Sequence, residues 1–208
     1  MFPNDSRSRS EAMAGWWPRL ALTAAFLSGL LAGCAPRGEP ARLPPFALVN
    51  QDGRPVRTED LRGRVTVLTV MFARCAESCP LVTARLVRAQ AELRAAGLTG
   101  RVRFVSITVD PLVDAPAILA RYAARVGADT SAWDFLTGPP EQVQRLVHGL
   151  DVPATNEGGR IGHGDVVLVV DAGGRIVERA AGTALAPSAI VARIRRAVAR
   201  DASARTGW

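Results

Sequence analysis

Uninterrupted runs of hydrophobic residues mark two stretches of the chain as buried strands. RVTVLTVMF at residues 64–72 and RVRFVSITVD at residues 101–110 are rich in β-branched side chains, which is typical of strands covered on both faces. Residues 165–182 carry two shorter apolar runs separated by a pair of glycines, so they predict two strands joined by a turn. Residues 46–56 predict a small hairpin around their Asp-Gly turn.

Apolar residues at helical spacing fill the segments between and after these strands. The pattern predicts four helices, at residues 80–97, 114–127, 139–150 and 186–200. Pro80 suits the first turn of the first helix and Gly97 its C-terminal end. Asp114 is the expected N-cap of the second helix. WDFLTG, at residues 133–138, predicts a brief strand or a loop.

The order of these elements predicts an α/β fold with a mixed central sheet flanked by helices. Strands and helices alternate through the first half of the domain, and a hairpin and a closing helix follow. This order matches the thioredoxin-like fold. The loop after the first buried strand, at residues 73–79, is then expected at the C-terminal edge of the sheet, where open α/β proteins place ligand and redox sites.

The first part of the chain has the pattern of an export signal. Arg19 precedes a short, mostly apolar run, and LAGC at residues 31–34 resembles the bacterial lipobox, in which the cysteine, here Cys34, is lipidated. The alternative is an uncleaved anchor helix over residues 16–34, but the apolar run is short for a membrane span. The resulting organisation is a signal peptide and lipoprotein anchor at 1–34, a Pro-, Gly- and Arg-rich tether at 35–45, the folded domain at 46–200 and a tail at 201–208.

This organisation places the domain outside the cytoplasm of a bacterium, on the periplasmic side, attached to a membrane by a lipid. The formal charge is +7, and all 26 basic residues are arginine. They are spread along the chain, aromatic residues make up only 5%, and no basic stripe with interleaved aromatics is present. The composition therefore argues against nucleic acid as a partner.

Cys75 and Cys79, in FARCAESCP, follow the first buried strand at the predicted start of a helix. The partial positive charge at a helix N-terminus is expected to favour the Cys79 thiolate, while Arg74 and Glu77 add charges of opposite sign. A purely structural disulfide would close a very short loop and add little stability. The pair is therefore a redox couple or part of a soft-metal site, and its spacing is wider than the usual Cys-x-x-Cys redox motif.

The chain has two histidines that could supply a third ligand. His148 lies near the end of a predicted helix, where a surface histidine needs no function. His163 lies between glycines in a predicted loop before a buried strand, and such a loop can approach the cysteine edge closely. Two thiolates and an imidazole suit copper, whereas zinc usually takes four ligands. The residues alone leave the redox couple and the metal site both open.

Four motifs in sequence order resemble the SCO/SenC family. They are CAESCP at residues 75–80, VDPLVD at 109–114, WDFLTG at 133–138, and His163 ahead of LVVDAGGRIV. The resemblance covers about residues 44–200, and the chain departs from the family at Ala73, Arg74 and Gly164.

The resemblance implies a membrane-tethered, thioredoxin-like copper protein that helps to assemble the CuA centre of cytochrome c oxidase. Its partner is then the CuA subunit of that oxidase or another copper enzyme. It implies Cys75, Cys79 and His163 as ligands of Cu(I) or Cu(II), and Asp110 as a residue close to the metal that affects copper binding.

This interpretation makes the protein a metallochaperone rather than an enzyme. Oxidation of Cys75 and Cys79 to a disulfide is expected to abolish copper binding, because it consumes two ligands. The alternative is a membrane-tethered thiol–disulfide reductase acting on acceptor cysteines, which uses the redox disulfide and does not need His163. A thiol peroxidase is a weaker alternative, since only Arg74 offers support for an activated cysteine.

Overall fold

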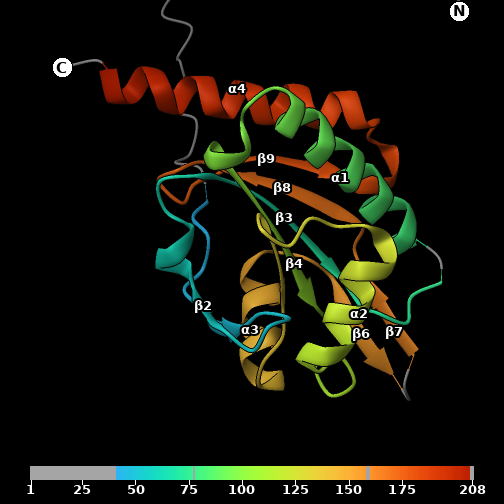
Figure 1. Ribbon diagram of the computed structural model, residues 1–208. Coiled ribbons are helices and arrows are strands. Elements are labelled where there is room, and N and C mark those ends of the chain that lie inside the picture. Colours follow the sequence, from blue (N-terminus) through green and yellow to red (C-terminus); the bar gives the residue numbers. More distant parts are fainter. Residues whose placement is uncertain (1–40, 77, 158–159, 207–208) are drawn as a thin grey trace, which may run out of the picture. The chain divides into compact units, whose positions relative to one another are not determined.

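A five-stranded mixed sheet forms the centre of the computed structural model, which describes residues 41–76, 78–157 and 160–206 (Figure 1). In spatial order its strands are β5 (Trp133–Leu136), β4 (Val102–Thr108), β3 (Val65–Met71), β8 (Val166–Val170) and β9 (Ile176–Ala181). β3, β4 and β5 run parallel, whereas β8 pairs antiparallel with both β3 and β9. The two buried strands and the hairpin that the sequence predicts are thus confirmed, and β3 is the middle strand.

All four predicted helices are present. They are α1 (Ser78–Ala95), α2 (Pro116–Val126), α3 (Pro140–Gly149) and α4 (Pro187–Thr206). Three short 3-10 helices are η1 (Thr58–Leu61), η2 (Thr99–Arg101) and η3 (Gly182–Ala184), and the predicted N-terminal hairpin is β1 (Ala47–Val49) with β2 (Pro55–Arg57). Because α1 begins at Ser78, Cys79 lies inside its first turn. The C-terminal helix extends six residues past the predicted end at Arg200.

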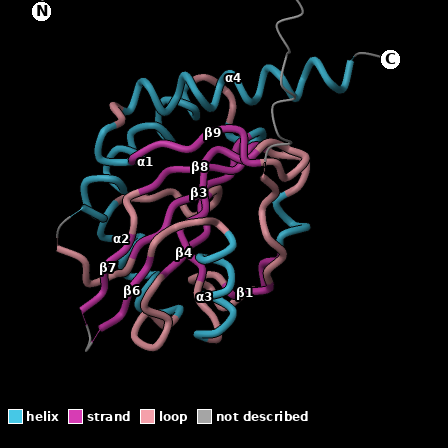
Figure 2. The backbone as a smooth tube through the Cα atoms, turned by 180° about the vertical axis from the view of Figure 1, so that it is seen from behind, coloured by secondary structure: helices cyan, strands magenta, loops and turns pink. Residues whose placement is uncertain are grey.

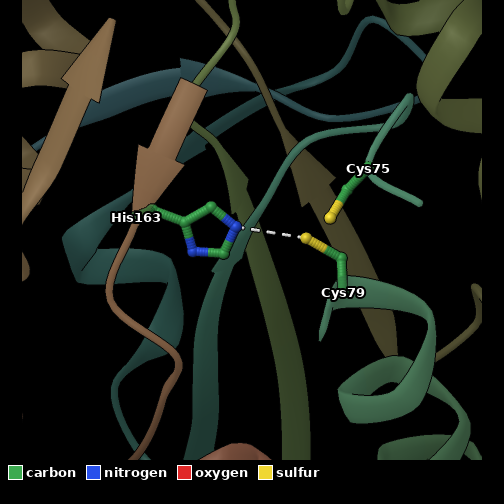
Figure 3. Close-up of side chains that lie close together, drawn as sticks. All are labelled: Cys75, Cys79 and His163. Carbon is green, nitrogen blue, oxygen red and sulfur yellow. Dashed lines mark hydrogen bonds between the residues drawn. The ribbon is translucent and has the colours of Figure 1, made fainter. Parts of the chain in front are cut away.

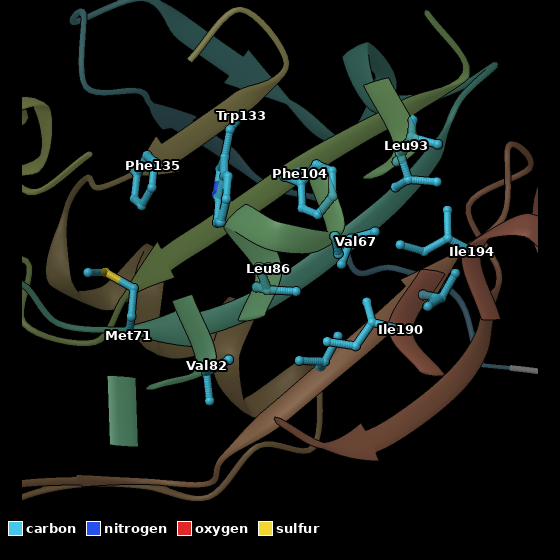
Figure 4. Packing of buried hydrophobic residues seen from close by; sticks show 14 of the residues in the cluster. Val67, Met71, Val82, Leu86, Leu93, Phe104, Trp133, Phe135, Ile190 and Ile194 are labelled. Atoms are coloured by element: carbon cyan, nitrogen blue, oxygen red, sulfur yellow. The ribbon is translucent and has the colours of Figure 1, made fainter. Parts of the chain in front are cut away.

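Two hydrophobic layers cover the two faces of the sheet. α1, α2 and α4 pack on one face in a cluster that includes Val67, Leu86 and Ile194 (Figure 4). α3, β1 and β2 cover the other face around Leu68 and Val147. Both views place α1 beside α4 (Figures 1 and 2). Burial on both faces is the reason that β3 is an unbroken apolar run in the sequence.

The prediction that Asp114 caps the second helix is wrong. Ala115 occupies the N-cap position of α2, without a side-chain hydrogen bond. The Asp114 side chain is instead fully buried, and its Oδ2 accepts hydrogen bonds from the Ala73 N–H at 2.9 Å and from the Thr108 hydroxyl at 2.6 Å. An interaction with the loop that carries the cysteines has replaced the local cap.

A second small hairpin, which the sequence pattern does not predict, lies outside the central sheet. It consists of β6 (Ala154–Glu157) and β7 (Arg160–His163), and His163 pairs with Ala154 at its base. His163 therefore ends a strand and does not lie in a loop. The sequence pattern does not indicate these strands, because the glycines and polar residues of the segment lack the apolar alternation of a strand.

The described part of the chain begins at residue 41, so the predicted anchor and Cys34 lie outside the described residues. Leu43, in the predicted tether, is buried, and its N–H donates to the Gly174 carbonyl at 2.9 Å. The packed part of the chain thus starts before Phe46. Within the described ranges, no helix combines the length and the apolar character needed to cross a membrane.

Truncation of Leu86 tests how strongly α1 is held on the sheet. Leu86 is 1% exposed, so Leu86→Ala is expected to lower the free energy of unfolding by about 2–5 kcal/mol through lost burial and a cavity. The matched control is Leu81→Ala in the same helix, because Leu81 is 47% exposed and should cost less than about 1 kcal/mol. Urea unfolding measures both values, and equal losses would contradict this packing.

Candidate metal centre

Three side chains from distant parts of the sequence converge at the C-terminal edge of β3. Cys75 lies in the loop between β3 and α1, Cys79 in the first turn of α1, and His163 at the end of β7 (Figure 3). The Sγ atom of Cys79 lies 3.1 Å from Nε2 of His163, and the ligand atoms of all three residues lie within 4.8 Å of one another. The structure thus brings together the three residues that the family resemblance implies as copper ligands.

The two thiols differ in their exposure to solvent. Cys75 is partly exposed, whereas Cys79 is 3% exposed. Burial, reinforced by the contact with Cys75, raises the pKa of Cys79 to about 12. The expectation that the helix N-terminus favours the Cys79 thiolate is therefore wrong, because loss of hydration outweighs the helix dipole. Cys79 is a neutral thiol at neutral pH, and a metal ion must displace its proton.

The hydrogen bonds of His163 assign its tautomer. Nδ1 lies 3.1 Å from the Gly164 carbonyl oxygen, which can only accept, so Nδ1–H donates to it. Nε2 is then the unprotonated nitrogen, and the Cys79 S–H donates to it. The Phe72 ring packs edge-on against the imidazole, with centroids 5.7 Å apart. A carbonyl that orients the far nitrogen in this way is the usual second partner of a metal-binding histidine.

The first residue of the cysteine loop is held by two side chains from other elements. The Ala73 N–H donates to Asp114, and the Ala73 carbonyl accepts a hydrogen bond from Nη2 of Arg125 at 3.1 Å. The Cys75 N–H turns back to the Phe72 carbonyl at 3.1 Å. Both polar backbone groups of Ala73 are therefore occupied, which fixes where the loop leaves β3.

Asp110 reaches this loop through Arg74. Its Oδ2 accepts a hydrogen bond from Nε of Arg74 at 2.9 Å, and the two side chains are 4% and 51% exposed, respectively. This ion pair neutralises much of the positive charge that Arg74 would otherwise place beside Cys75. Glu77, the predicted anion of the loop, lies outside the described residues. Asp110 is thus positioned to influence Cys75 indirectly.

A short turn, η3, links the segment after His163 to the helix that carries Cys79. The N–H of Thr183 donates to Oδ2 of Asp165 at 2.6 Å. From α1, Arg85 donates to the Gly182 carbonyl at 2.9 Å and also to the Thr183 carbonyl. This arrangement needs a glycine, because a Cβ at Gly182 would lie 2.6 Å from Oδ1 of Asp165 and 2.9 Å from Val82. No local sequence pattern indicated this contact.

The other histidine is not part of the centre. His148 is exposed in the last turn of α3, and it is absent from the group of close ligand atoms. Among the residues in the described ranges, Cys75, Cys79 and His163 are the only such group of three or more. The expectation that His148 is a surface residue is confirmed.

Comparisons with known proteins agree on one family. The SCO1/SenC family profile matches residues 35–199 of this chain. The SCO1 protein homolog of Bacillus subtilis is 36% identical over 124 residues, which cover 54% of this chain and 63% of that relative. This chain therefore matches slightly less than two thirds of the curated relative.

Two solved structures show the same thioredoxin-like fold. A SCO1/SenC family lipoprotein from Bacillus anthracis matches with a TM-score of 0.71 and 30% identity, over 77% of this chain and 98% of its own. Bradyrhizobium japonicum ScoI, solved with copper bound, matches with a TM-score of 0.64 and 25% identity, over 76% and 99% of the two chains. The predicted α/β, thioredoxin-like fold class is confirmed.

The buried carboxyl of Asp114 gives a testable pH dependence. Burial raises the pKa of Asp114 above its ordinary value of 3.8, so the uncharged form is favoured in the fold. The buried, uncharged carboxyl of Asp114 contributes its full stabilisation at pH values below 3.8, the ordinary pKa of the group. This stabilisation is lost as the pH rises through the raised pKa of Asp114 in the folded protein. Asp114→Asn retains an acceptor oxygen and cannot ionise. Urea unfolding should show the variant gaining stability relative to wild type as pH rises, and a pH-independent difference would contradict the burial effect.

Substitution of Gly182 tests the contact between η3, α1 and Asp165. Gly182→Ala should lower the free energy of unfolding by about 1–3 kcal/mol, because the added methyl group forces packed elements apart. It should also alter the imidazole nitrogen resonances of His163. Gly100→Ala is the control, since a Cβ there meets nothing within 4 Å. If the two variants behave alike in urea and in NMR spectra, η3 does not position the centre.

Proposed function

Because this chain belongs to the SCO1/SenC family, we propose that it is a copper-binding metallochaperone for the CuA centre of cytochrome c oxidase. The observation that carries this proposal is the convergence of Cys75, Cys79 and His163 within 4.8 Å. The copper-bound Bradyrhizobium relative supports it. Another copper enzyme of the same compartment is the alternative acceptor.

The chemistry of the donor set fits Cu(I). Thiolate sulfur and imidazole nitrogen are the soft and borderline donors that Cu(I) prefers, and three of them satisfy its low coordination number. Structural zinc sites normally take four protein ligands, but no fourth histidine, cysteine or carboxylate of the described residues joins the group. The tautomer of His163 leaves Nε2 free to bind the ion. The same atoms can also accept Cu(II) when both thiols are deprotonated.

Copper binding is coupled to proton release in this proposal. The Cys79 proton, held by a pKa of about 12, must leave when the thiolate binds the ion. The apparent affinity for copper should therefore rise with pH and fall in acid. Oxidation of the two thiols to a disulfide would release two protons and pass two electrons to an oxidant, such as a disulfide of a partner protein. Both thiolate ligands would be lost, so redox state gates loading.

The unequal exposure of the two sulfur atoms sets the order in which an acceptor displaces the copper ligands. Cys75 is partly exposed, whereas Cys79 is buried. An incoming acceptor thiolate can therefore displace Cys75 first, while Cys79 and His163 hold the ion. Asp110 would act on this step through its ion pair with Arg74, the neighbour of Cys75. A lipid on Cys34 would keep the domain at the membrane on the periplasmic side, near a membrane-bound oxidase.

The partly exposed Cys75 beside a buried partner thiol also favours a second candidate, a thiol–disulfide reductase. Cys75 would attack a disulfide of the acceptor, and Cys79 would resolve the mixed disulfide. This exchange needs no imidazole ligand. The raised pKa of Cys79 makes Cys75 the better attacking group. Loss of His163 therefore separates the two functions.

Anaerobic Cu(I) titration against a competing chelator tests the proposed ligands. Every sample carries Cys34→Ser, so that only Cys75 and Cys79 supply thiols. The reduced protein should bind one equivalent tightly, and His163→Ala and Cys75→Ser should weaken binding more than about tenfold. His148→Ala, the matched histidine control, should bind like the parent protein.

Equal affinity in all four proteins would overturn the copper site. The reductase function is measured in the same samples by reduction of a disulfide substrate. If His163→Ala retains full copper affinity and Cys75→Ser abolishes disulfide reduction, the reductase is the better description.

A further inference from the structure

Large hydrophobic side chains are exposed at three positions in the described ranges, and all three lie in segments that follow Cys79 or Asp110 in the sequence. Leu81 follows Cys79 by two residues and is 47% exposed. Leu112 and Val113, 81% and 46% exposed, follow Asp110 in the loop between β4 and α2. Single exposed hydrophobic residues are common on proteins. Their restriction to the segments around one site indicates a surface that another protein covers.

A cavity of about 640 Å³ opens beside Leu112. Three segments form its walls: the loop after β4, one side of α3, and the approach to β6. Its lining is mostly apolar and includes Val109, Leu112, Val143, Val147, Val152 and Pro153. We call this cavity the α3 groove. It has the size and apolar character of a site that receives a few side chains of a ligand or a partner.

Two residues that line the α3 groove contact residues of the metal centre or their neighbours. Asp110 lines it, and the same carboxylate accepts the hydrogen bond from Arg74, which precedes Cys75. On the other side Ala154 lines it, and Ala154 pairs with His163 in the β6–β7 hairpin. The adjacent Pro153 carbonyl accepts the Gly164 N–H at 2.7 Å. A segment seated in the groove would therefore lie against the supports of Cys75 and His163.

The charged residues that line the α3 groove indicate which charge a bound partner segment should carry. Asp110 is 3% exposed and already paired with Arg74, so it offers little free negative charge. Arg145 lines the groove from the exposed face of α3, and no ion pair of Arg145 is found among the described residues. His148 also lines the groove from α3. An apolar segment bearing a carboxylate would complement this groove.

We propose that the α3 groove docks the copper acceptor through an apolar, acidic segment of the CuA-bearing protein. The inference rests on the proposed function and adds to it the surface that aligns the acceptor. Transfer requires the acceptor's ligands to reach an ion held beside Cys79, which is only 3% exposed. Docking against Asp110, whose ion-pair partner Arg74 precedes Cys75, would hold the two proteins in register while ligands exchange, which raises the effective concentration of the incoming thiolate.

The test uses the full-length, reduced, Cu(I)-loaded protein and the soluble CuA domain of the same organism's oxidase. Leu112→Glu should raise the Kd of the complex more than about tenfold, since an exposed apolar anchor is lost and a repelling charge is added. Leu112→Arg should have a smaller effect, because its charge attracts an acidic segment. Arg145→Glu should also weaken the complex. Ala199→Glu, at an exposed position of α4, is the matched control and should bind like wild type.

Three readouts make failure of the docking surface distinguishable from failure of the proposed function. Cu(I) affinity should be unchanged in all four variants, because none alters a proposed ligand. If wild type transfers copper and both Leu112 variants match its Kd and transfer rate, the groove proposal is overturned and the chaperone function stands. If wild type binds Cu(I) but forms no complex, both are overturned. If Leu112→Glu dissociates a homodimer in sedimentation and leaves acceptor binding intact, the occupant is a second copy and the proposal fails.

Discussion

The contact between the Cys79 thiol and the His163 imidazole is the interaction around which this structure is organised. It joins residues 84 positions apart, one at the start of α1 and one at the end of β7. Neither element can shift without separating the two atoms. The surrounding contacts serve this constraint, since Asp114 and Arg125 fix the loop before α1, while Asp165 and Arg85 hold the segment after β7 to α1 through η3.

Burial of Cys79 lowers the reactivity of its thiol but does not prevent the residue from holding a metal ion. A thiol removed from water holds its proton tightly, so Cys79 without a metal ion is a poor nucleophile at neutral pH and is less open to oxidation. A soft metal ion reverses this preference, because the metal–thiolate bond replaces the proton. Cys75 and His163 then remain partly exposed to a partner, whereas Cys79 is buried. A protein that carries an ion between two binding partners needs this combination of retention and access.

The surface around the metal centre has exposed hydrophobic residues and a groove that a partner protein could occupy. Among the described residues, the large hydrophobic side chains that are exposed lie in the segments that follow Cys79 and Asp110. The α3 groove is lined by Asp110 and Ala154, which contact Arg74 and His163. The central sheet makes this arrangement possible, because the cysteine loop and the segment containing Asp110 follow adjacent parallel strands and therefore emerge at the same edge. The groove and the metal centre are thus two consequences of one sheet topology.

The sequence by itself determined the elements whose pattern is local. The apolar runs of β3 and β4 and the helical spacing of α1 identify them directly, and the four motifs identify the family and its cysteines and histidine. Tertiary structure alone decided three features: the pKa of Cys79, the buried role of Asp114 and the contact at Gly182. Each depends on hydration or on hydrogen bonds between residues far apart in the chain. Local periodicity reports neither, because it records only which face of an element is buried and not what it is buried against.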